Sequence, residues 1–120
     1  MRHLVLLLLF SVYASAGYSA VTACPDIGAI QSEGVSKSQY YPSLGFLMHH
    51  DSTYSTPQNW SFSMGFIEAR NAVQAKEKAK ALLMTMRGHP VPEYDGSYYA
   101  WICRYEIEGI MEAKATTYYS

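Results

Sequence analysis

Two adjacent histidines, His49 and His50, are the side chains of this sequence best able to bind a metal or a cofactor. Neutral imidazole is the commonest protein ligand for transition metals, and it also binds haem iron. Tyr54 follows a few residues later, and its phenol is another donor that haem iron accepts. Neighbouring residues of a strand point to opposite faces, so at most one of the two histidines faces a given pocket.

His50 is the favoured ligand because it is in phase with apolar neighbours. Phe46, Met48 and His50 fall on one face of a strand, and a porphyrin needs an apolar bed. The order of preference is therefore His50, then His49, then Tyr54, for a haem bound without a covalent link. The alternative is that these are ordinary polar residues at the end of a strand, with any haem stacked weakly on surface tyrosines.

No common catalytic motif is present: the sequence lacks G-x-S-x-G, H-E-x-x-H, a P-loop and C-x-x-C. Nine Lys and Arg against ten Asp and Glu give a net charge of -1, which disfavours a nucleic-acid partner. The 11 tyrosines favour a binding surface, because Tyr offers a large contact area at low entropy cost. These features predict a binding protein rather than an enzyme. Its partner is either a small ligand or another protein.

The N-terminal sequence predicts export. A positive start, Met1-Arg2-His3, precedes an apolar run from Leu4 to Tyr13 and then small residues that a signal peptidase reads. We therefore expect a signal peptide over residues 1–16, with cleavage as late as residue 20 as an alternative. The run is too short to span a bilayer, which needs roughly 20 apolar residues. The mature protein is then periplasmic or secreted, without a transmembrane segment.

Export determines how the two cysteines are interpreted. In an oxidising compartment Cys24 and Cys103 most simply form one disulfide. The alternative is a lipoprotein anchored at Cys24, because the preceding residues loosely match a lipobox. Against that alternative, the apolar run ends well before Cys24, and lipidation would leave Cys103 as a lone thiol.

The elements that position these residues follow from hydrophobic periodicity. Residues 21–120 read as a single small α+β domain with the order α-β-β-α-β-β. We expect an antiparallel sheet of about four strands, with one long helix packed on it and a short N-terminal helix. The expected ranges are a helix at 25–34, strands at 45–50 and 60–67, a helix at 72–87, and strands at 98–107 and 110–119.

Helix-capping residues and the alternation of side chains support the prediction of the longer elements. Asn71 and Gln74 have capping-box spacing before the helix at 72–87, and Gly88 is expected to end it. Residues of one face alternate along the two clearest strands. They are Trp60, Phe62, Met64 and Phe66 in one strand, and Tyr99, Trp101, Cys103, Tyr105 and Ile107 in the other. Trp60, Phe62, Phe66 and Trp101 are expected in the core.

Several of these residues resemble a family of small exported bacterial proteins labelled hemin-binding proteins, known otherwise only as a domain of unknown function in intracellular pathogens. The resemblance covers most of the mature chain. It rests on Ala23-Cys24-Pro25, Ile30-Gln31-x-Glu33-Gly34, Trp60-x-Phe62, Gly88-x-Pro90-x-Pro92 and Trp101-x-Cys103-x-Tyr105. It implies export, a disulfide-linked domain and a role in haem binding, but no haem-ligand signature transfers with it.

The mass of the exported protein tests the compartment and the cysteine pairing together. We expect the intact mass of the mature chain to lack two hydrogens and to carry no lipid, because Cys24 and Cys103 are joined. A diacylglycerol adduct on Cys24, or two thiols that react with an alkylating reagent in the native protein, would contradict this prediction.

Overall fold

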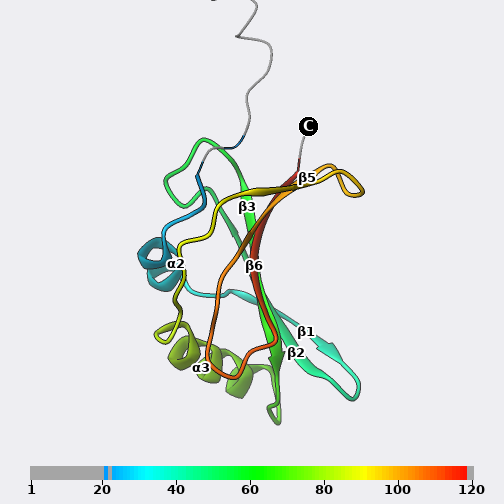
Figure 1. Cartoon of the computed structure of the whole chain (residues 1–120). Coiled ribbons are helices and arrows are strands. Elements are labelled where there is room, and N and C mark those ends of the chain that lie inside the picture. Colours follow the sequence, from blue (N-terminus) through cyan, green and yellow to red (C-terminus); the bar gives the residue numbers. More distant parts are fainter. Residues whose placement is uncertain (1–20, 22, 119–120) are drawn as a thin grey trace, which may run out of the picture.

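Six strands pair into one sheet in the order β1-β2-β3-β6-β5-β4, and every pairing is antiparallel (Figure 1). The computed structural model describes residue 21 and residues 23–118, so the predicted signal peptide lies outside the described residues. The described elements are α2 (Ile27–Glu33), β1 (Lys37–Tyr41), β2 (Gly45–Ser52), β3 (Trp60–Ile67), α3 (Ala72–Leu83), β4 (Glu93–Asp95), β5 (Ala100–Arg104) and β6 (Glu112–Tyr118).

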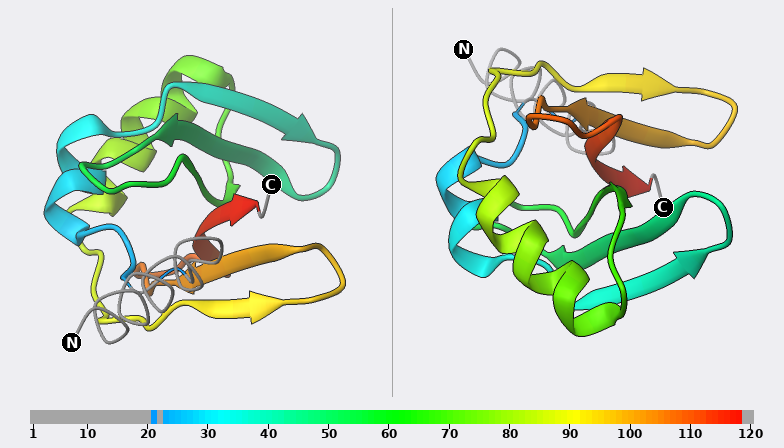
Figure 2. Two further views of the ribbon diagram at one scale, coloured as in Figure 1. Left: turned by 90° about the horizontal axis from the view of Figure 1, so that it is seen from above. Right: turned by 90° about the horizontal axis from the view of Figure 1, so that it is seen from below.

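The sheet consists of two three-stranded meanders, β1-β2-β3 and β4-β5-β6, that meet where β3 pairs with β6. Each meander uses short connections between strands that are adjacent in the sequence, as antiparallel strands allow. Figure 2 shows both helices on one side of the sheet, with the β1–β2 and β4–β5 hairpins extending away from them. The sheet therefore has one face covered by α2 and α3, and an opposite face that neither of these helices covers.

The predicted fold class was wrong in the number of strands, because two edge strands were missed. β1 has the sequence KSQYY, and its first four residues are exposed. An edge strand exposed on both faces has no hydrophobic alternation, so only its pairing with β2 reveals it. β4 falls between the predicted helix at 72–87 and the predicted strand at 98–107, where no element was expected. It pairs with β5 across a turn in which the Ser97 amide donates to Asp95 Oδ1, at 2.9 Å.

The long helix predicted over residues 72–87 was also wrong, because α3 ends at Leu83. Its start is as predicted: Asn71 Oδ1 accepts a hydrogen bond from the Gln74 amide at 2.9 Å. The amides of Met84, Thr85 and Met86 then donate to residues three positions back, in turns rather than α-helix. The Thr85 hydroxyl also donates to the Leu82 carbonyl at 2.7 Å, which competes with continuation of the helix.

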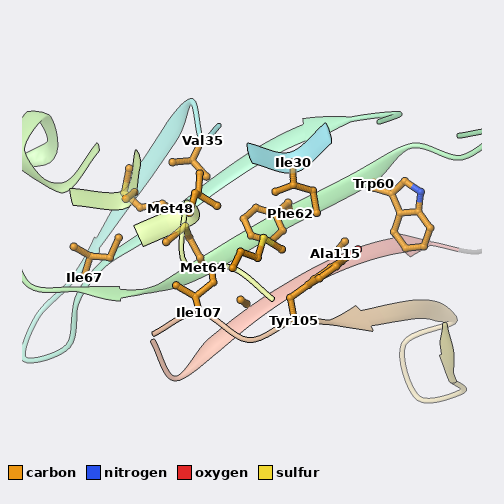
Figure 3. Close-up of a cluster of buried hydrophobic side chains, with 14 of the residues drawn as sticks. Ile30, Val35, Met48, Trp60, Phe62, Met64, Ile67, Tyr105, Ile107 and Ala115 are labelled. Atoms are coloured by element: carbon orange, nitrogen blue, oxygen red, sulfur yellow. The ribbon is translucent and has the colours of Figure 1, made fainter. Parts of the chain in front are cut away.

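The core lies between the helices and the covered face of the sheet (Figure 3). Trp60, Phe62 and Met64 of β3 are each at most 1% exposed. The alternation predicted for this strand breaks after Met64, where the register with β2 shifts, so Ile67 is buried and Phe66 only half-buried. Two further predictions, for Trp101 and Tyr99, were also wrong. Trp101 is half-buried, and Tyr99 lies in a turn and is 67% exposed.

The predicted disulfide is confirmed: Cys24 and Cys103 are bonded, at a sequence separation of 79 residues. It attaches the segment before α2 to β5. The Tyr105 hydroxyl supports the same attachment by donating to the Pro25 carbonyl. Since the Cys24 sulfur is already bonded, it is unavailable for the thioether of a lipid anchor. In the chain-entropy description, closing a loop of this length stabilises the fold by roughly 4.5 kcal/mol.

The contact between α3 and the sheet can be tested at Ala79, which is fully buried. Ala79→Leu should lower the free energy of unfolding by about 1 to 3 kcal/mol, because the site has no room for a larger side chain. Lys80→Ala, at the next residue and exposed, is the matched control and should change it by less than about 0.5 kcal/mol. Urea denaturation measures both, and equal, small effects would contradict this packing.

Candidate functional site

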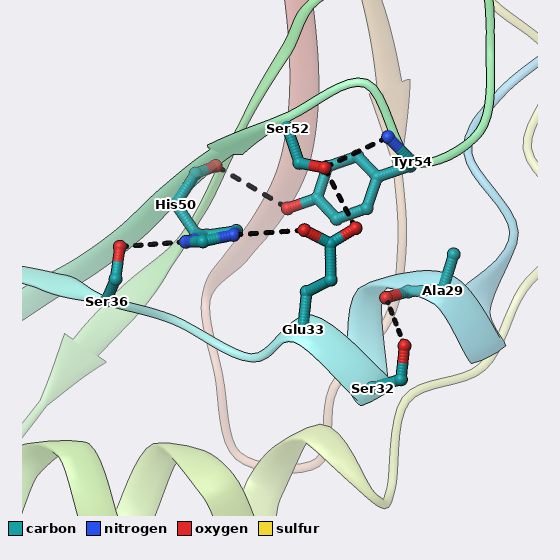
Figure 4. A network of polar contacts seen from close by, with 7 residues as sticks. All are labelled: Ala29, Ser32, Glu33, Ser36, His50, Ser52 and Tyr54. Atoms are coloured by element: carbon teal, nitrogen blue, oxygen red, sulfur yellow. Dashed lines mark hydrogen bonds and ion pairs between the residues drawn. The ribbon is translucent and has the colours of Figure 1, made fainter.

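His50 lies at the centre of a polar network that joins α2 to β2 (Figure 4). Its Nε2 is 3.2 Å from Glu33 Oε1, at the end of α2, and its Nδ1 is 2.8 Å from the hydroxyl of Ser36. The Ser52 hydroxyl donates to Glu33 Oε2 at 2.8 Å and accepts from the Tyr54 amide at 3.0 Å. We call this set, Glu33, Ser36, His50, Ser52 and Tyr54, the His50 network.

Both ring nitrogens of His50 are engaged in this network. A carboxylate only accepts hydrogen bonds, so Nε2 donates to Glu33, and in the neutral ring Nδ1 accepts from Ser36. A histidine that binds iron must present a nitrogen lone pair to the metal. In this arrangement His50 has no nitrogen lone pair left for a ligand unless the network opens.

Ser36, His50 and Glu33 follow the order of a nucleophile, a base and a carboxylate in hydrolases. A groove of about 540 Å³ lies between α2 and α3, and its walls include Val35, Val73 and Leu83. The Ser36 hydroxyl does not face α3; it points towards β2 and His50 (Figure 4). The geometry therefore makes the network a connection between α2 and the sheet.

Tyr54 is the second predicted ligand in this network, and it is only 3% exposed. Its ring packs against that of His50 with centroids 6.4 Å apart, and its hydroxyl donates weakly to the His50 carbonyl at 3.5 Å. Burial, and then the charges of Glu33 and Asp51, raise the pKa of this phenol well above its ordinary value. The phenolate that would bind iron is therefore disfavoured.

His49 points to the opposite side of the sheet from His50, as its strand position requires. It pairs in register with Lys37 of β1 and Ser63 of β3, so these three residues share the uncovered face. Its side chain is half-buried. Among the residues that the structure describes, no side-chain hydrogen bond or ion pair holds its imidazole.

The uncovered face at His49 and along β2 carries residues that suit an apolar ligand with acidic groups. Leu47 is on the same face of β2, two residues away. Nearer the start of β2, where Tyr41 pairs with Gly45, Tyr41 contacts Phe66 edge-on, with ring centroids 5.4 Å apart. Lys37 adds a positive charge next to His49. We call Lys37, Tyr41, Leu47, His49 and Phe66 the β1–β3 patch.

The other half of the uncovered face is hollowed into a cavity of about 450 Å³ between β3, β6, β5 and the β4–β5 turn. A third cavity, of about 360 Å³, lies beside the disulfide, and His89 is part of its wall. His89 shares this cavity with Cys24 and Tyr105, and no residue of the His50 network lines it. Within residues 23–118 there is no cluster of three or more metal-binding side chains, and no helix there is long and apolar enough to cross a membrane.

Glu33 and Ser36, the partners of the His50 ring, and Ser52, which bonds Glu33, were not predicted from the sequence. Glu33 and Ser36 precede His50 by 17 and 14 residues, and they reach it only because the β1–β2 hairpin folds back. No local motif marks such a set. The alternation of β2 does separate His49 from His50, and that signal was available in the sequence.

The chain matches, over residues 23–115, a protein family described as "Domain of unknown function (DUF4949)". No curated protein and no solved structure matches it.

The two histidines should differ in their contribution to stability. His50→Ala should lower the free energy of unfolding by about 1 to 2 kcal/mol, because it leaves Ser36 and Glu33 without their partner. His49→Ala, its neighbour on the open face, should change that free energy by less than about 0.5 kcal/mol. Urea denaturation at neutral pH compares the two variants. A larger loss for His49→Ala would show that the His50 network does not hold α2 to the sheet.

Proposed function

The chain belongs to the DUF4949 family, whose description assigns no activity, and we propose that it is an exported binding protein that carries haem on the β1–β3 patch. His49 carries this proposal, because it is the half-buried imidazole on the uncovered face without a hydrogen-bonding partner among the described residues. The resemblance to hemin-binding proteins supports the choice of ligand.

The chemistry of the β1–β3 patch fits a porphyrin. The macrocycle is flat and apolar and carries acidic propionates, and its iron accepts an imidazole nitrogen. Leu47 and Phe66 offer an apolar surface, and the Lys37 ammonium suits a propionate. His49 would be the axial ligand, in place of His50 and Tyr54, whose polar atoms are occupied within the His50 network.

Export is part of the same proposal. The N-terminal residues have the pattern of a signal peptide, and the Cys24–Cys103 disulfide is of the kind that persists in oxidising compartments. We place the mature protein in the periplasm or in the medium, where a haem carrier would meet its ligand.

A protein partner is the second candidate, and the exposed tyrosines favour it. Tyr94, Tyr98 and Tyr99 of the β4–β5 hairpin are 48%, 70% and 67% exposed. The turn also contains Gly96 and Ser97, and Tyr, Gly and Ser are residue types that are enriched in antibody loops. A protein-interaction module would use this hairpin and would need no small ligand.

A hemin titration of the two histidine variants tests the haem proposal. Wild-type protein should shift the Soret band, and the shift should saturate at one hemin per protein. His49→Ala should lose that shift, whereas His50→Ala, the matched control, should keep it. A circular dichroism spectrum establishes that each variant is folded.

Three results would contradict the haem proposal. Loss of the shift in His50→Ala alone would assign the ligand to the His50 network after all. An unchanged shift in both variants and in the double variant would remove the histidines as ligands. Absorbance that keeps rising with excess hemin in the wild type would exclude a haem site and favour the protein-interaction module.

A further inference from the structure

The cavity on the other half of the uncovered face has a lining of a distinct chemical kind. We call it the β5–β6 cavity; it has a volume of about 450 Å³. It adjoins the β1–β3 patch along β3, because Ser63 of its lining pairs in register with His49. Its lining includes hydroxyls, two tyrosines and charges of both signs, so it suits a polar ligand rather than a purely apolar one.

The floor of the β5–β6 cavity combines hydroxyl-bearing and apolar side chains in register. Ser61 pairs with Thr116, which pairs with Ile102, so these three residues form one row across β3, β6 and β5. Ala100, the next residue of β5 on this face, is only 1% exposed. The Ser and Thr hydroxyls of this row both donate and accept hydrogen bonds, and Ile102 adds an apolar contact beside them. A flat ligand with many hydroxyls suits such a floor.

Two tyrosines border the floor. Tyr118 pairs with Ala100, and Tyr98 precedes Ala100 in the β4–β5 turn. They are 68% and 70% exposed. An aromatic side chain that stays this exposed beside a cavity can offer its ring face to the C–H groups of a ligand and its hydroxyl to the ligand's polar atoms.

The two ends of the cavity carry opposite charges. Arg104 and Lys114 pair across β5 and β6 at one end. Lys114 is 2.6 Å from Glu112 and so is already neutralised, whereas no described ion pair includes Arg104. A guanidinium is well suited to hold a carboxylate by two parallel hydrogen bonds.

Asp95 lies at the opposite end, where it pairs in register with Ala100. Its Oδ1 is fixed by the Ser97 amide at 2.9 Å, so the carboxylate has a set orientation. A carboxylate accepts more hydrogen bonds than this one, and a ligand hydroxyl is a suitable donor. Ala100 and Arg104 are the ends of β5, so the two charged ends are separated by about 13 Å along the strand.

We propose that the β5–β6 cavity binds a short acidic saccharide of one or two rings. The sugar hydroxyls contact the Ser, Thr and Asp95 side chains, a ring stacks on Tyr98 or Tyr118, and the sugar carboxylate pairs with Arg104. A bare anion would use only the Arg104 end, and an apolar ligand would leave the hydroxyls and both charges desolvated without partners. This inference does not rest on haem binding, because none of the residues that it assigns to the saccharide belongs to the β1–β3 patch.

Calorimetric titration with digalacturonic acid tests the proposal on the full mature protein. Digalactose, its uncharged counterpart, and citrate, an anion without a sugar ring, are titrated in parallel. We expect saturable binding of digalacturonic acid at one per protein, at least about tenfold weaker binding of digalactose, and no saturable binding of citrate.

Single variants then assign the ends of the cavity. Arg104→Gln should weaken the binding of digalacturonic acid at least about tenfold and leave the affinity for digalactose unchanged, since it removes only the partner of the carboxylate. Tyr98→Ala should weaken the binding of both disaccharides. Lys80 belongs to α3, on the other side of the sheet. Lys80→Gln is therefore the matched control, and it should change the affinity for neither disaccharide.

The outcomes that overturn the proposal are distinct. Citrate binding as tightly as digalacturonic acid would show an anion site only. Equal affinity for the two disaccharides would remove Arg104 from the site, and no binding of either at millimolar concentration would exclude a saccharide. If hemin does not bind but digalacturonic acid does, the haem proposal fails and this one stands.

Discussion

The pairing of β3 with β6 is the constraint on which the rest of the structure depends. It is the one place where the two meanders of the sheet meet, so both halves depend on the register of β3. Trp60, Phe62 and Met64 fill the core on one side of this strand. Ser61 and Ser63, on the other side, form part of the floor of the β5–β6 cavity. A register shift of one residue would exchange these two sets of side chains, so burial of the aromatic set also fixes the hydroxyl set on the open face.

The same alternation gives two adjacent histidines different roles. His50 faces the helices and is held by Glu33 and Ser36, which connects the end of α2 to β2. His49 faces the uncovered side and remains without a described partner. A buried or half-buried imidazole that is fully hydrogen-bonded stabilises its surroundings, whereas one without a partner can bind a ligand. Under the haem proposal, stability and ligand binding are thereby separated into neighbouring residues of one strand.

The disulfide attaches the N-terminal part of the described domain to the sheet. Cys24 precedes α2, and Cys103 is in β5, so the bond joins the start of the described chain to the second meander. The Gln31 side chain connects α2 to α3 by donating to the Leu83 carbonyl, 2.8 Å away, at the end of α3. A domain of about 100 residues has a limited core, and a covalent bond across a long loop removes much of the entropy of its unfolded state.

The sequence by itself determined the features that depend on local periodicity or on a forced choice. The range of β3, the cap of α3 at Asn71 and the pairing of two cysteines follow from alternation, side-chain hydrogen bonding to nearby amides, and an even number of thiols. Only the tertiary structure decided the rest. β1 and β4 are strands because a neighbour pairs with them, and α3 ends early because Thr85 bonds its last turn. The His50 network and the β5–β6 cavity unite residues of distant segments, and such contacts leave no pattern in the sequence because they arise only when strands pair and helices dock.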